Sequence, residues 1–102
     1  MIGMEHRLRQ AEHVLAQRAT ETTVLLKLRD GQYYTLNEVG GRVWELCDGT
    51  RCVADVVAIL CQEYDVPPAT IEADVVELMQ ELAHEQLVVA VHATADGAAA
   101  PA

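Results

Sequence analysis

Aromatic residues are scarce in this chain of 102 residues, which has no Phe, one Trp and three Tyr. Its hydrophobic content of 51% therefore comes mainly from aliphatic residues, and it is sufficient for the core of one compact domain. The chain also lacks the roughly 20 consecutive apolar residues of a membrane span, and its N-terminus lacks the apolar run of a signal peptide. We therefore expect a soluble, cytoplasmic protein with no membrane partner.

Basic residues are scarce in most of the chain. Residues 1–29 carry five basic and three acidic side chains, a net charge of +2, which leaves −11 for residues 30–102 out of a total of −9. An acidic surface repels phosphate backbones, so we expect no nucleic-acid partner. The same surface favours a partner that carries Lys and Arg.

Paired cysteine motifs are absent as well. The three cysteines, Cys47, Cys52 and Cys61, form no C-x-x-C pair, which favours a reducing compartment over a disulfide scaffold. Their spacing, with four scattered histidines, matches no metal-ligand pattern. Glu77 and Glu81 lie one helical turn apart, as on a solvated helix face. We expect no catalytic residues, no metal and no cofactor.

The first part of the chain has β-strand character. Residues 14–16, 22–28 and 32–36 are short apolar or β-branched segments. Asp30 and Gly31 separate the last two, and Asp-Gly is a favoured two-residue hairpin turn. Because both faces of this hairpin carry apolar groups, we expect helices to cover at least one of them.

From Asn37 onward the apolar spacing becomes helical. Asn37 is a good N-cap residue, and Gly40 and Gly41 inside the first helix each cost about 1 kcal/mol relative to Ala. We attribute that cost to a close approach between this helix and a neighbouring element. The pattern predicts helices from Asn37 to Asp48, from Val53 to Tyr64 and from Pro68 to about Gln86, followed by a short strand over residues 87–91.

These elements predict an α+β fold that resembles a winged helix-turn-helix, with a small antiparallel N-terminal β-sheet packed on three α-helices. We expect residues 1–12 to form a flexible lead-in and residues 13–91 to form the folded domain. The Ala-rich segment 92–102 has no amphipathic period, so we expect it to be disordered.

The third predicted helix carries two apolar seams flanked by acidic residues. One seam contains Ile71, Val75, Leu78 and Leu82, and its spacing is typical of a core-facing helix. The second seam contains Val76, Met79 and Ala83. Two interpretations remain open: the second seam widens the core face, or it borders a groove with an acidic rim beside the sheet edge.

Three segments of the chain resemble the PqqD-like family, the leader-recognition elements of ribosomally made and post-translationally modified peptides. They are YYTLNEVGGRVWELCDGTRCVADVV (33–57), PPATIEADV (67–75) and ELAHEQLVV (81–89). Two features depart from the family pattern. Cys52 stands where family members often have Thr in a capping box with the residue at Asp55, and the first helix looks more like relatives in lasso-peptide and other clusters than like the branch that makes pyrroloquinoline quinone.

The resemblance implies a non-catalytic protein that binds a precursor leader peptide beside the third strand and the third helix, by strand addition. It also implies a separate modifying enzyme as partner, such as a radical-SAM enzyme or a leader protease. Carried onto this sequence, it indicates the following peptide-binding residues: Tyr33, Tyr34, Thr35 and Leu36 in the strand, and Val76, Met79, Gln80 and Ala83 in the helix.

Two other functions are compatible with the predicted fold. The first is a winged-helix DNA-binding transcription regulator, which the acidic third helix disfavours. The second is a structural adaptor that binds only an enzyme and has no peptide groove. An exposed sheet edge and apolar seam can also pair two copies, so we expect a monomer or a weak homodimer.

Overall fold

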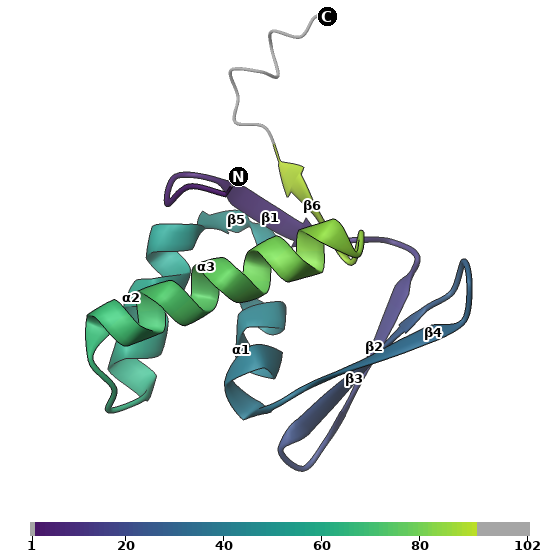
Figure 1. The fold of residues 1–102 in the computed structure, drawn as a ribbon, viewed down its shortest axis with the longest axis horizontal. Helices are drawn as coiled ribbons and strands as arrows, with labels where there is room; N and C mark the ends of the chain where they lie inside the picture. The colour runs from purple at the N-terminus through teal and green to yellow at the C-terminus, as the bar shows by residue number, and fades with distance from the viewer. Residues whose placement is uncertain (1, 92–102) are drawn as a thin grey trace, which may run out of the picture.

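The computed structural model describes residues 2–91, which contain three helices and two antiparallel sheets of three strands each (Figure 1). The predicted α+β class, with a small antiparallel N-terminal sheet and three helices, is confirmed, and a second three-stranded sheet is present that the sequence did not indicate. The segment 92–102, predicted to be disordered, lies outside the described residues. The strands are β1 (Arg7–Gln10), β2 (Val14–Ala19), β3 (Thr22–Lys27), β4 (Gln32–Leu36), β5 (Asp48–Cys52) and β6 (Val88–Val91), and the helices are α1 (Glu38–Leu46), α2 (Val53–Glu63) and α3 (Pro68–His84).

The first sheet, in the order β2-β3-β4, is a meander of neighbouring segments, and we call it the meander sheet. Lys27 pairs with Gln32, so four residues connect β3 to β4, and the predicted two-residue turn is wrong. Asp30 explains the wider loop, because its Oδ1 accepts the backbone N–H of Gln32 at 3.1 Å. Gly31 closes the loop with φ of 73°, a backbone conformation that favours glycine.

The second sheet, in the order β5-β1-β6, joins segments that are far apart in the sequence, and we call it the closing sheet. Its central strand comes from the segment 1–12, so the prediction of a flexible lead-in is wrong for residues 7–10. Leu8 is 3% exposed and packs in the core between two exposed arginines. One apolar residue in four is too weak a pattern to indicate a strand from the sequence. The segment is a strand because it pairs with β5 and β6. The predicted C-terminal strand is confirmed as β6.

The start of α1 agrees with the prediction. Asn37 is the N-cap, and its Oδ1 accepts the backbone N–H of Gly40 at 2.7 Å. A Cβ atom at Gly41 would overlap the hydroxyl of Thr23 on β3. The expected close approach of this helix to a neighbour is therefore confirmed, and the neighbour is β3.

The start of α2 uses Cys52 as its N-cap. The Asp55 carboxylate accepts the backbone N–H of Cys52 at 3.1 Å, which satisfies one donor at the helix start and lowers the pKa of Asp55. Thr50, two residues before Cys52, does not cap the helix in place of the threonine that family members often have at position 52. Its hydroxyl instead donates to Asp48 at 2.7 Å.

The core lies between the three helices and the inner faces of both sheets. α2 and α3 pack against each other, α1 packs against β3 and β4, and the last turn of α3 leads into β6 (Figure 1). No helix within residues 2–91 combines the length and the apolar character needed to cross a membrane. The largest fully buried side chains include Leu25, Leu60, Met79 and Leu87.

Candidate binding groove between β4 and α3

Strand β4 is an edge strand that runs beside α3. In the order β2-β3-β4 it pairs with β3, and no other strand of the described residues pairs with its second side. An edge strand presents unpaired backbone N–H and C=O groups, which can accept a further strand. This edge is therefore a ready hydrogen-bonding surface for extended polypeptide.

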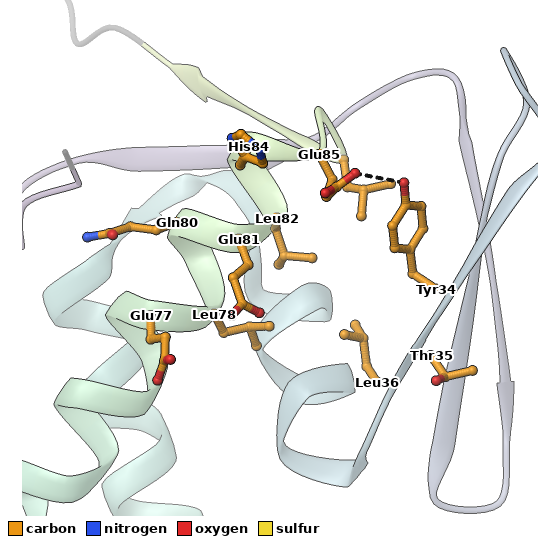
Figure 2. A pocket seen from close by; sticks show the side chains of 11 residues that line it. Tyr34, Thr35, Leu36, Glu77, Leu78, Gln80, Glu81, Leu82, His84 and Glu85 are labelled. Atoms are coloured by element: carbon orange, nitrogen blue, oxygen red, sulfur yellow. Dashed lines mark hydrogen bonds between the residues drawn. The ribbon is translucent and has the colours of Figure 1, made fainter.

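A hollow of about 570 Å³ lies between this edge and α3. Leu36 of β4 and Leu78 and Leu82 of α3 face one another across it (Figure 2). Their side chains form an apolar floor that no described residue fills. The lining residues are Tyr34, Thr35, Leu36, Glu77, Leu78, Gln80, Glu81, Leu82, His84, Glu85 and Leu87. We call this hollow, together with a second one that continues from it along α3, the groove.

One hydrogen bond spans the groove at the end of α3. The hydroxyl of Tyr34 lies 2.9 Å from Oε1 of Glu85, as Figure 2 shows, and 2.7 Å from Oε1 of Gln32. Because the hydroxyl has one proton, it donates to one of these acceptors at a time. Partial burial and then the Glu85 carboxylate raise the pKa of Tyr34, while Lys27, with Nζ 5.8 Å from the ring centroid, lowers it.

The helix side of the groove is acidic. A second hollow of about 530 Å³ continues along α3 and shares Thr35, Leu36, Glu77, Leu78 and Glu81 with the first. Four carboxylates therefore border the groove, and in residues 2–91 none of them forms an ion pair. They are Asp74, Glu77, Glu81 and Glu85. A carboxylate without a cationic partner attracts a positively charged ligand.

Four of the eight predicted peptide-binding residues border the groove: Tyr34, Thr35, Leu36 and Gln80. The side chain of Gln80 extends away from β4, so it contributes only to the margin (Figure 2). Tyr33 lies in the same strand but is 70% exposed and lines a separate hollow on the opposite face of the meander sheet. The pleat explains this position, because successive strand residues point to opposite faces.

The predicted assignment of the two seams of α3 is wrong at its centre. Met79 is 2% exposed and lies in the core, whereas Leu78 is half-buried and lines the groove. Val76 is half-buried against the core, and Ala83 lines a different hollow beside β1 and β6. Adjacent helix positions differ in direction by about 100°, so the position of the neighbouring elements decides which seam is covered.

An acidic rim was expected, but the predicted peptide-binding residues did not include the acids that form it or the two leucines of the first seam that line the groove, Leu78 and Leu82. Glu77, Glu81 and Glu85 repeat every four residues on the same face as Leu78 and Leu82. A sequence signal was present, because acidic residues flank both seams. It did not indicate which seam shares a face with β4.

No cluster of three or more His, Cys, Asp or Glu side chains that could hold a metal ion is found in the described part of the chain. Cys47 is buried, and burial raises the pKa of its thiol to about 12. This thiol is therefore protonated near neutral pH, where nucleophilic catalysis would need the thiolate.

Comparison with known proteins agrees with this geometry. Residues 22–88 match the family model described as coenzyme PQQ synthesis protein D (PqqD). TbiB1, solved in complex with the TbiA(beta) leader peptide, is 30% identical, with a TM-score of 0.71 over 78% of this chain and 93% of that one. No curated protein sequence matches the chain at a significant level.

Two further solved structures share the fold. A lasso peptide synthetase B1 complexed with the leader peptide is 24% identical, with a TM-score of 0.72, covering 81% of this chain and 98% of that one. The PqqD truncation of Methylobacterium extorquens PqqCD, described as a functional, stand-alone recognition element for ribosomally synthesised and post-translationally modified peptides, is 26% identical, with a TM-score of 0.73 over 87% and 95% of the two chains.

The fold and the groove define a small α+β module with an open strand edge beside an apolar, acid-rimmed hollow. Within that class, the family match over residues 22–88 shows that the chain belongs to the PqqD family. The family resemblance drawn from the sequence is confirmed.

Proposed function

We propose that this chain binds the leader segment of a precursor peptide, without catalysis, and presents it to a separate modifying enzyme. The leader lies in the groove as an added strand beside β4 and contacts α3 with its side chains. Two structural relatives were solved with leader peptides, which supports this proposal.

The observation that carries the proposal is the unpaired side of β4 next to an unfilled apolar floor. In strand addition, backbone hydrogen bonds to the sheet edge provide affinity and side-chain pockets provide specificity. Leu36, Leu78 and Leu82 form such a pocket for an apolar side chain of the guest. The Tyr34–Glu85 hydrogen bond crosses the same space, so we expect it to open when the guest binds.

The proposed function requires a partner enzyme. A protein that only holds the leader needs a second protein to modify the attached core peptide. Two relatives are described as a lasso peptide synthetase B1 and as the PqqD truncation of PqqCD, which supports an association with peptide-modifying enzymes. We expect an enzyme such as a radical-SAM enzyme or a leader protease in this role.

The direct test is an NMR titration of the chain with a synthetic leader peptide, taken from the precursor encoded beside its gene. Amide signals of Thr35, Leu36 and Leu82 should shift at micromolar leader. Thr20, in the turn between β2 and β3 and away from the groove, is the internal control. If the groove amides stay unmoved, the chain does not bind leader there and the proposal is wrong.

The alternative of a DNA-binding regulator finds little support in the groove helix. α3 contains Glu72, Asp74, Glu77 and Glu81 and has no Lys or Arg. A recognition helix of this charge repels the phosphate backbone. A salt-sensitive shift of duplex DNA by the chain would reverse this ranking, and co-purification with an enzyme without leader binding would favour the adaptor.

A further inference from the structure

We infer that the segment bound in the groove carries at least two Lys or Arg residues at alternate positions beside an apolar anchor. This inference rests on the proposed function and adds the chemical class of the guest. It follows from the charge and the spacing of the carboxylates of Glu77, Glu81 and Glu85, which form the acidic wall of the groove.

The carboxylates of the acidic wall form no ion pair within residues 2–91. Four basic residues in the described chain form ion pairs, and all of these lie elsewhere: Arg18 with Glu45, Lys27 with Asp30, Arg42 with Glu45 and Glu63, and Arg51 with Asp48. Lys27 lies near one end of the groove, with its Nζ 5.8 Å from the centroid of the Tyr34 ring, but its ion pair is with Asp30. A guest with acidic side chains would add repulsion to a chain of net charge −9.

The spacing of the carboxylates along the acidic wall matches the two-residue repeat of an extended peptide. Glu77 and Glu81 lie on α3, and Glu85 is its C-cap, so successive carboxylates are four residues apart, about 6 Å along the helix axis at 1.5 Å per residue. Alternate residues of a strand are separated by about 6.7 Å. A strand in the groove can therefore place successive groove-facing side chains opposite successive carboxylates.

The apolar floor is compatible with basic side chains. Lys and Arg can lay their aliphatic stems along apolar surface while their charged ends reach polar groups at its margin. Leu78 and Leu82 provide that surface, and Glu81 of α3 and the C-cap residue Glu85 lie beside it. The apolar anchor of the guest packs in the pocket of Leu36, Leu78 and Leu82 at a groove-facing position next to the basic ones. Arginine is also suited to bidentate contact with a carboxylate.

The test is a display selection of short random peptides on the whole chain, followed by binding measurements on synthetic copies of the enriched peptides. We expect Lys and Arg to be enriched at alternate positions next to Leu, Ile or Val. Copies with Gln in place of the basic residues should bind roughly tenfold more weakly, because each exposed ion pair contributes a modest amount. This loss should shrink as salt is added.

Matched variants of the chain complete the test. E77Q/E81Q/E85Q should weaken binding of the basic peptides roughly tenfold, while E12Q/E21Q/E72Q, which makes the same change in net charge at exposed positions outside the groove, should have little effect. Glutamine at position 85 retains an acceptor for Tyr34, and circular dichroism confirms that each variant is folded.

The outcomes separate this inference from the proposed function. Enriched peptides that shift the groove amides but show no preference for Lys or Arg would overturn the inference and leave the function standing. Equal losses from the two triple variants would overturn it too, since net charge alone would then explain binding. If no enriched peptide shifts Thr35, Leu36 or Leu82, peptide binding in the groove itself is refuted.

Discussion

The two sheets differ in how they use their strands. In the closing sheet, β1 has a neighbour on each side, and it joins both ends of the described chain to the segment between α1 and α2 (Figure 1). Residues next to it extend these links, since Ala11 donates to the carbonyl of Leu87 and Val53 donates to that of His6. The meander sheet instead joins only segments that follow one another in the chain, and one of its edge strands, β4, borders the groove beside α3.

This difference shows how a small domain divides stability from function. The closing sheet uses its hydrogen bonds to connect distant segments, and that holds the helices around the core. The meander sheet is built from local hairpins and can keep an edge open, because the rest of the fold does not depend on pairing at that edge. Four predictions test this division.

Replacing Leu8 in the closing sheet with Ala should lower the free energy of unfolding by about 2–5 kcal/mol, because a buried leucine loses its contacts and leaves a cavity. The matched change Leu15→Ala on β2, where the side chain is 56% exposed, should change it by less than about 0.5 kcal/mol. Urea denaturation measures both. Equal effects would mean that the two sheets contribute alike to stability.

The same contrast exists between neighbours on α3. Met79→Ala should destabilise the fold by about 2–5 kcal/mol, because Met79 is 2% exposed in the core. Leu78→Ala should cost much less stability and should instead weaken leader binding, because Leu78 lines the groove. Denaturation and peptide titration on both variants give the comparison. A leader affinity unchanged by Leu78→Ala would remove Leu78 from the site.

The junction between the meander sheet and α1 should tolerate little added volume. Gly41→Ala should destabilise the chain by about 1–3 kcal/mol, because the new Cβ would overlap the Thr23 hydroxyl. Thr23→Ala in the same chain should recover part of that loss by removing the hydroxyl. A double-mutant cycle measures the coupling, and additive effects of the two changes would contradict the assigned contact.

Acid should act on the closing sheet through Asp48 in β5. Hydrogen bonds from Thr50 and the charge of Arg51 lower the pKa of Asp48, so its stabilising effect is present above the unfolded pKa and is lost as pH falls through the folded value. Asp48→Asn should therefore flatten the fall in stability below about pH 5.

The control for that change is Glu21→Gln in the turn between β2 and β3, where the side chain is exposed. Melting temperatures over a pH series should show a flatter profile for Asp48→Asn and an unaltered one for Glu21→Gln. A profile for Asp48→Asn that parallels the parent chain would show that this carboxylate does not contribute.

Local chemistry determined much of this fold. The N-cap Asn37, the paired glycines that follow and the Pro68 start of α3 each act within a few residues, so the sequence predicts the helices to within about two residues. The strands of the meander sheet are predicted for the same reason, since their partners are their neighbours in the chain.

The remaining features depend on contacts between segments that are far apart in the chain. β1 and β5 have weak local patterns and exist because they pair with each other, and β1 pairs also with β6. Likewise, α3 carries two apolar seams, and packing against α1 and α2 buried Met79 and left Leu78 facing β4. A helix presents its side chains in all directions, so the sequence supplies the apolar residues and the acids, while contact with other elements selects which of them border the groove.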